Sequence, residues 1–75
     1  MQQPSFDFVA FLVDNFKTHQ GLMAFLRAFG VDAPKENTVY QWFRRGSVPA
    51  EWAMLLAGLL ELERGAANIG KYVRL

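Results

Sequence analysis

Glycine and proline divide this 75-residue chain into four segments, each long enough for only a short helix. Gly30, Gly46 and Gly65 follow stretches with helical apolar spacing, where a glycine ends a helix at the least steric cost. Pro34 and Pro49 come soon after the first two of these glycines, and proline fits only the first turn of a helix. These glycines and prolines predict four helices. The first spans about 5–17 and the second about 20–29, the third begins between 34 and 37 and ends at 45, and the fourth spans about 48–64.

Hydroxyl side chains and apolar periodicity add detail to these helices. Ser5 is expected to cap the first helix and Ser47 the fourth, because their oxygens can accept from orphan backbone N–H groups. The first helix has an apolar face so wide that either the second and fourth helices or another subunit must cover it. Its stripe comprises Phe6, Val9, Leu12, Val13 and Phe16, with Phe8 and Phe11 off centre.

The second and fourth helices each show a buried face, and we expect Met23 and Met54 to fill gaps in the core. Residues 66–75 could form a short strand, a docking tail or a last helical turn. The expected architecture is therefore an all-α domain over 1–65 followed by a C-terminal tail over 66–75, which could serve dimerisation or docking. The predicted buried face of the second helix comprises Leu22, Phe25, Leu26 and Phe29. That of the fourth helix comprises Trp52, Leu55, Leu56, Leu59, Leu60 and Leu62.

Composition bounds the class of protein. A hydrophobic content of 52% favours one folded domain, and a domain this small often gains burial from a partner, so a homodimer is expected. The chain has no cysteine, which excludes disulfides, thiolate metal sites and a cysteine nucleophile. We expect neither a signal peptide nor a membrane span, and the cytoplasm fits this expectation.

Catalysis has little support. His19 is the single histidine, so no metal site can be completed around it, and we expect it to be an exposed connector or capping residue. Glu61 and Glu63 are two residues apart on a helix and point to different faces. No glycine-rich phosphate loop or nucleophile elbow is present. The sequence predicts no enzyme, no cofactor and no metal.

The third helix has two contrasting sides. Val39, Trp42 and Phe43 share one side at helical spacing, whereas polar and basic residues share the other. Asn and Gln can pair with adenine and Arg with guanine, and a helix fits the major groove, so this side is typical of a DNA-reading helix. A plain surface helix with a hydrophobic seam is the alternative interpretation. The polar side comprises Asn37, Tyr40, Gln41, Arg44 and Arg45.

Charge distribution favours the same segment. The whole chain carries only +1, less than a nucleic-acid binder usually shows. Lys35, Arg44 and Arg45 against Glu36 leave +2 over residues 33–49, and the tail also carries +2. The positive excess thus lies at the third helix and at the tail.

A helix ending at Gly30, a turn, the run Thr38-Val39-Tyr40-Gln41-Trp42 and the closing Arg45-Gly46-Ser47-Val48-Pro49 resemble the helix-turn-helix of phage Cro and repressor proteins. The resemblance covers about residues 18–62 and is closest to the small Cro-like branch. It implies a compact four- to five-helix lambda-repressor-like domain. It also implies a transcriptional regulator that binds an inverted-repeat operator in double-stranded DNA as a homodimer, in the cytoplasm of a bacterial host cell and nucleoid-associated when bound.

By this resemblance, the base-contacting residues flank the buried valine. Glu36 also lies there, but an acid close to phosphate is repelled, so its expected role is to match the helix dipole. The implied base contacts are Asn37, Tyr40, Gln41 and Arg44. The implied contacts to the DNA backbone are Lys17, Gln20, Lys35, Thr38 and Arg45, with the backbone at the start of the second helix.

Two departures from the family pattern are visible. Gly30 to Val39 spans nine residues where the family usually has about six, and Leu26 replaces a small alanine where the two helices cross. The longer turn could move the third helix outward and change its angle in the groove. The alternative function is therefore a protein-interaction module on the same scaffold, such as an antirepressor or host-factor binder, without DNA binding.

Overall fold

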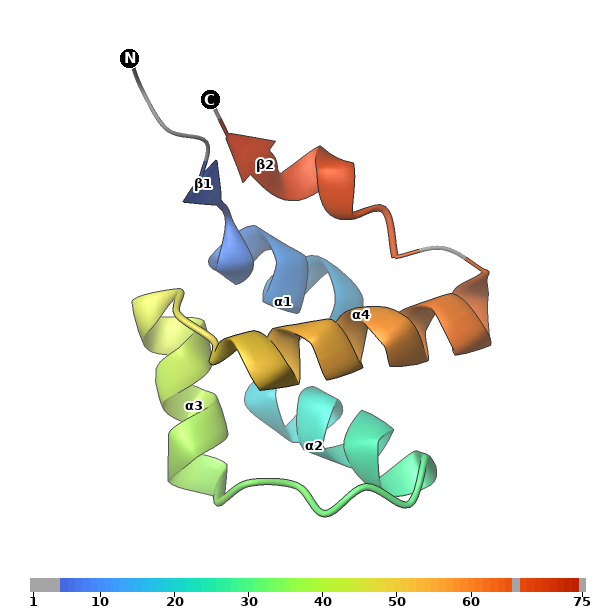
Figure 1. Cartoon of the computed structure of the whole chain (residues 1–75). Helices are drawn as coiled ribbons and strands as arrows, with labels where there is room; N and C mark the ends of the chain where they lie inside the picture. Colours follow the sequence, from blue (N-terminus) through green and yellow to red (C-terminus); the bar gives the residue numbers. More distant parts are fainter. Residues whose placement is uncertain (1–4, 66, 75) are drawn as a thin grey trace.

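The computed structural model describes residues 5–65 and 67–74, and within them the chain is mostly helical (Figure 1). This confirms the predicted helical class, to which a two-stranded antiparallel sheet is added. The sequence offered a strand as one possibility for residues 66–75 but predicted no strand at Ser5–Phe6. In the view of Figure 1, α4 runs across the front of the molecule, with α1 above it and α2 below it, and α3 lies beside its first turn. The elements are β1 (Ser5–Phe6), α1 (Phe8–Phe16), α2 (His19–Ala28), α3 (Glu36–Arg45), α4 (Ala50–Arg64), the 3-10 helix η1 (Ile69–Tyr72) and β2 (Val73–Arg74).

The helix ends lie where glycine predicted them. Gly30, Gly46 and Gly65 all have positive φ angles, which glycine adopts without strain. At the end of α2 the N–H of Val31 donates to the carbonyl of Leu26 at 3.0 Å, the long bond of a Schellman motif.

Both predicted serine caps are wrong. Ser5 belongs to β1, and α1 is capped instead by Asp7, whose Oδ1 accepts from the N–H of Ala10 at 3.0 Å. A carboxylate at this position satisfies an orphan donor and also suits the positive helix start. Pro49 occupies the cap position of α4 and no side chain hydrogen bonds there, so Ser47 does not cap this helix.

The corner between α1 and α2 is tight. Lys17 has φ 68° and ψ −55°, and the N–H of Thr18 donates to the carbonyl of Phe16 at 2.7 Å. This is a γ-turn with positive φ, a strained conformation for a residue with a side chain. Thr18 then caps α2 by accepting from the N–H of Gly21 at 3.1 Å. A Cβ on Gly21 would collide with the Phe16 carbonyl, so only glycine lets the two helices meet this closely.

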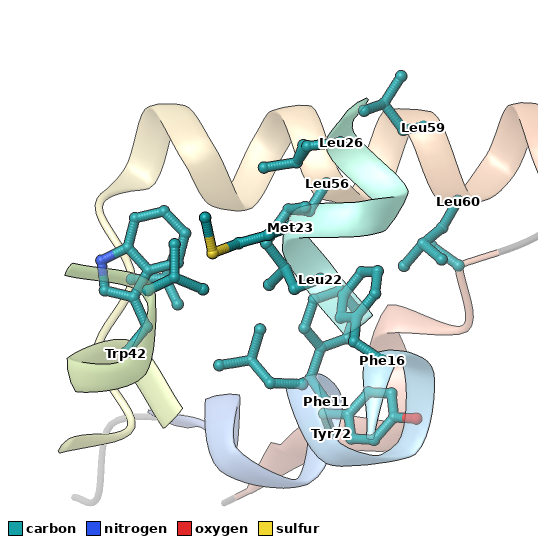
Figure 2. Close-up of a cluster of buried hydrophobic side chains, with 14 residues drawn as sticks. Phe11, Phe16, Leu22, Met23, Leu26, Trp42, Leu56, Leu59, Leu60 and Tyr72 are labelled. Atoms are coloured by element: carbon teal, nitrogen blue, oxygen red, sulfur yellow. The ribbon is translucent and has the colours of Figure 1, made fainter. Parts of the chain in front are cut away.

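The core lies between the four helices (Figure 2). Leu12, Leu22, Leu26, Leu56 and Leu60 are completely buried, and the side chains from α1, α2 and α4 point toward one another. Met23 fills the core as predicted. Four residues predicted to be buried are exposed: Phe29, which follows α2, and Met54, Leu55 and Leu62, which α4 turns outward. Val9 and Val13 of α1 are also exposed, and for them the sequence left cover by another subunit open.

The C-terminal segment packs on its own chain. β2 pairs with β1 in the register Ser5 to Arg74 and Phe6 to Val73. The ring of Tyr72 is buried and lies 5.4 Å from that of Phe11, edge to face. The segment thus covers the aromatic side of α1, for which the sequence predicted cover by the second and fourth helices or by another subunit. It combines the helical turn and the strand that the sequence offered as alternatives.

Candidate nucleic-acid interface

α3 is mounted on the core through one side. Val39 is completely buried and Trp42 is 4% exposed, as predicted. The indole of Trp42 packs against that of Trp52 on α4, with ring centroids 5.8 Å apart. Because these anchors fix the rotation of α3 about its axis, they also decide which side chains face outward.

The outward side of α3 presents amide and guanidinium groups. Asn37, Gln41 and Arg44 stand at i, i+4 and i+7, which places them in one row opposite Val39 and Trp42. Asn37 and Arg44 are exposed and Gln41 is half-buried. These three side chains supply both donors and acceptors, which is what base edges in the major groove require.

One flank of this row borders a hollow of about 410 Å³. Thr38 and Arg45 are exposed on this flank, and Gln41 lines the hollow together with the segment Ser47–Pro49. The hollow leaves Thr38, Gln41 and Arg45 open to a ligand from one side.

The other flank joins α3 to α2. His19 Nε2 lies 3.1 Å from Glu36 Oε1, and the His19 ring meets the Tyr40 ring edge to face at 5.3 Å. His19 is therefore a half-buried contact between two helix starts. The sequence predicted an exposed connector or a capping residue, and the cap of α2 is Thr18 instead. Glu36 is held by His19, and Tyr40 is steadied on the same flank but still 38% exposed.

The remaining predicted backbone contacts lie on turns beside α3. Lys17 and Gln20 are exposed at the corner between α1 and α2, and Lys35 is exposed directly before α3. Since His19 of the same α2 turn contacts Glu36 and Tyr40, the start of α2 lies next to the start of α3. The peptide groups at the start of α2 thus lie close to the row on α3, as an anion contact beside it would need.

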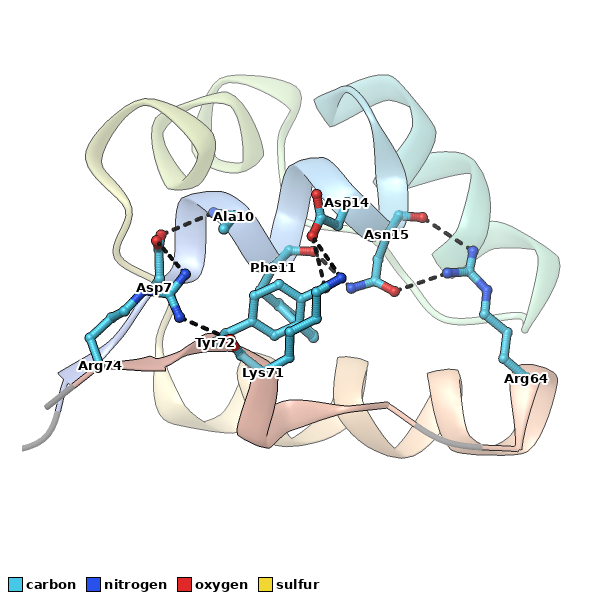
Figure 3. A network of polar contacts seen from close by, with 9 residues as sticks. All are labelled: Asp7, Ala10, Phe11, Asp14, Asn15, Arg64, Lys71, Tyr72 and Arg74. Atoms are coloured by element: carbon cyan, nitrogen blue, oxygen red, sulfur yellow. Dashed lines mark hydrogen bonds and ion pairs between the residues drawn. The ribbon is translucent and has the colours of Figure 1, made fainter.

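The lysines and arginines fall into two groups, and Figure 3 shows the group at the C-terminal end. At the C-terminal end, Arg64 donates to Asn15 Oδ1 at 2.9 Å, Lys71 lies 3.7 Å from Asp14, and Arg74 reaches Asp7 at 3.4 Å. Within residues 5–65 and 67–74, the other basic residues make no ion pair or side-chain hydrogen bond with protein. These are Lys17, Arg27, Lys35, Arg44 and Arg45, all exposed on the α1–α2 corner, α2, the connector and α3.

The connection between α2 and α3 is long. It runs over Phe29–Lys35, seven residues, where helices in a helix-turn-helix are commonly joined by three or four. Leu26, the residue that replaces a small side chain, is completely buried. The structure therefore contains the long connection that the sequence indicated, and its effect on docking stays a prediction.

No protein-family profile, curated protein or solved structure matches this chain. In the part of the chain that the structure describes, no three His, Asp or Glu side chains gather as metal ligands. None of the helices described is long and apolar enough to cross a bilayer.

His19 is the site residue that sequence reasoning missed. Thr18 followed by a glycine three residues later could have placed His19 in the first turn of α2, because Thr18 caps that helix. The sequence could not show which residues of α3 His19 faces, because that depends on the path of the seven-residue connection.

Proposed function

We propose that this chain is a sequence-specific DNA-binding transcriptional regulator of the phage Cro and repressor type. In this proposal α2 and α3 act as a helix-turn-helix, and α3 enters the major groove. The observation that carries it is the row of Asn37, Gln41 and Arg44, which the buried pair Val39 and Trp42 aims away from the core.

The chemistry of the row suits base recognition. Asn37 and Gln41 could each donate from the side-chain amide to adenine N7 and accept from the adenine N6 amino group, and Arg44 could donate to both O6 and N7 of guanine. Tyr40 could touch a thymine methyl or a phosphate on the α2 flank. A row with only one kind of polar group could not distinguish the four base pairs in this way.

The basic side chains that pair with no acidic group in the described residues would supply the electrostatic attraction to DNA. Lys35 and Arg45 flank the row, and Lys17 lies at the strained corner before α2. Because no acidic side chain in the described residues neutralises them, their charge is available to phosphates. With Thr38 and Gln20 they would position the helix on the DNA backbone, without reading sequence.

A net charge of +1 per chain keeps the non-specific attraction weak. Affinity should therefore depend on base contacts and on two subunits acting together. In a homodimer, two copies of α3 would enter successive major grooves about 34 Å apart, so the operator should be an approximate inverted repeat.

Selection from a random duplex library at low salt tests the proposal. We expect enrichment of an inverted repeat whose half-sites lie about one helical turn apart. Affinity for the selected duplex should fall linearly with the logarithm of salt concentration. A library that yields no enriched sequence at low salt, where binding is most favoured, would refute the proposal.

Glu36 motivates a second candidate function. Its side chain is 63% exposed at the start of α3, within reach of any phosphate that approaches Tyr40. A protein-interaction module without DNA binding would tolerate this acid better. Replacing Arg44 and Arg45 by Ala separates the two functions: a DNA complex weakens with a smaller salt slope, whereas a protein complex formed elsewhere survives.

A further inference from the structure

The outward side of α4 carries apolar side chains that its own chain leaves uncovered. Met54 is 76% exposed and Leu62 is 78% exposed, and Leu55 is also exposed. Single exposed apolar residues are ordinary on protein surfaces. These three lie on one side of one helix, opposite the buried Leu56 and Leu60, and together they form an apolar patch.

Gly58 lies at the centre of this patch, four residues after Met54 and four before Leu62. A Cβ added at Gly58 would meet no atom within 4 Å, so the fold of the single chain does not need glycine here. Glycine also destabilises a helix interior relative to alanine. A small residue between two large apolar ones is, however, what lets another helix approach closely.

The spacing about Gly58 is symmetric, and this symmetry selects the partner. If two copies of α4 cross antiparallel at Gly58, a two-fold axis places Met54 of each copy opposite Leu62 of the other. Leu55 then lies beside the same Leu62 on the other flank. A surface that matches itself in this way fits a second copy of this chain better than an unrelated partner.

Charge selects the antiparallel orientation. Glu51 and Glu61 lie on the same side of α4 as the patch. In a parallel pair each glutamate would face its own copy, and like charges would repel. In the antiparallel pair the two copies of Glu51 are about 21 Å apart along the axis and those of Glu61 about 9 Å. The two helix dipoles also oppose each other favourably.

We propose that a second copy of this chain docks antiparallel on α4 through the patch of Met54, Leu55, Gly58 and Leu62. The proposal rests on the proposed function, since it names the surface through which two operator-bound subunits would meet. An apolar hollow of about 400 Å³ starts at Met54 and Gly58 and continues to Phe6 and Phe8. It extends the contact beyond α4 toward β1 and α1.

The size of the patch predicts a weak, reversible dimer. α4 has 15 residues and is about 22 Å long, and a strip about 10 Å wide along it offers roughly 220 Å². Stable interfaces bury about 800 Å² on each partner. The helix pair alone therefore falls short, and the walls of the hollow must contribute for the dimer to persist without DNA.

Sedimentation equilibrium of the full chain, without DNA, tests the docking surface. We expect the mean mass to rise from 8.5 kDa toward twice that value as the concentration goes from micromolar to millimolar. Gly58→Leu should weaken association about tenfold or more by holding the helices apart. Gly58→Ala should also weaken it, although the same change raises the melting temperature of the single chain, so lost association cannot be blamed on unfolding.

Charge-matched variants on α4 sharpen the test. Leu62→Lys places a charge in the patch and should abolish association, whereas Glu63→Gln, which changes the net charge equally one residue further on, should leave it intact. A chain that is monomeric at every concentration, or a dimer unaffected by Gly58→Leu and Leu62→Lys, would overturn the docking surface. Failure of the proposed function looks different: the chain dimerises through α4 but selects no duplex.

Discussion

The basic residues of α3 and those of the C-terminal segment have the same charge but different surroundings. Arg64, Lys71 and Arg74 each contact an oxygen of the N-terminal half of the chain (Figure 3). Arg44 and Arg45 contact no acceptor in the described residues. The net charge of +1 hides this division, because it counts both groups alike. Placement of the cations, not their number, favours α3 as the anion-binding surface.

The two regions also differ in what holds them. The tail is joined to α1 by exposed ion pairs, which contribute little to stability, and by the buried ring of Tyr72. α3 is held by Val39 and Trp42, and its two arginines, Arg44 and Arg45, are exposed to solvent. Burial secures both regions, and charge is available for binding in only one.

The largest expected effect comes from removing the support of α3. Trp42→Ala should lower the free energy of unfolding by about 3–5 kcal/mol, because a large buried ring is lost and leaves a cavity. That is a large share of the stability of a small domain. Urea denaturation followed by circular dichroism measures it. A loss below about 1 kcal/mol would mean that Trp42 does not anchor α3.

The difference in DNA binding expected between the basic residues of α3 and those of the C-terminal segment can be tested directly. Arg44→Ala should cost about 1–3 kcal/mol of binding free energy for the selected duplex and relax specificity at one base pair. Arg74→Ala removes an equal charge from the tail and serves as the control, with binding nearly unchanged. Fluorescence anisotropy at fixed salt measures both. Equal losses from the two substitutions would contradict the contrast.

Tyr72 is expected to make the stability of the fold depend on pH in the alkaline range. Burial raises the pKa of its hydroxyl above the ordinary 10.0, and the hydrogen bond to Asp14 and the charge of Asp14 raise it further, outweighing an opposing effect of Asn15. The pKa of Tyr72 is higher in the folded chain than in the unfolded chain. The stabilisation of the fold by the protonated hydroxyl is therefore complete below about pH 10, and it is lost as the pH rises through the pKa of the folded chain.

Tyr72→Phe tests this link. It should lower the free energy of unfolding by about 0.5–1.5 kcal/mol near neutral pH, since one hydrogen bond is lost while the ring remains. The substitution should also reduce the loss of stability above about pH 10. Denaturation at a series of pH values compares the two proteins. Identical alkaline profiles would show that Tyr72 does not cause the loss.

The smallest effect is expected for the ion pair of the tail. Lys71→Ala should change the free energy of unfolding by about 0–1 kcal/mol, because Lys71 and Asp14 are both well exposed. DNA binding should not change. A thermal melt and an anisotropy titration of the same sample check both statements, and a clear loss of DNA affinity would place the tail in the binding surface.

The sequence predicted the helices because local chemistry decides where they end. Gly30, Gly46 and Gly65 need no distant contact to terminate a helix. The inward pair Val39 and Trp42 was also readable, since the pattern repeats at helical spacing.

The tail and the α2 flank of the interface could not be read in this way. Two-residue strands carry too little pattern, and the pairing of Phe6 with Val73 joins opposite ends of the chain. The contact of His19 with Glu36 depends on how seven connecting residues cross the surface. Met54 and Leu62 were assigned to the core because periodicity identifies an apolar residue without showing whether another element covers it.

Chemical-shift mapping of the labelled chain with the selected duplex tests most directly whether the outward row of α3 meets DNA. The side-chain amides of Asn37 and Gln41 and the guanidinium of Arg44 should show the largest shifts, with smaller ones at the start of α2 and little change over residues 67–74. Shifts that concentrate on the tail, or a row that stays unchanged in a saturated complex, would contradict the account.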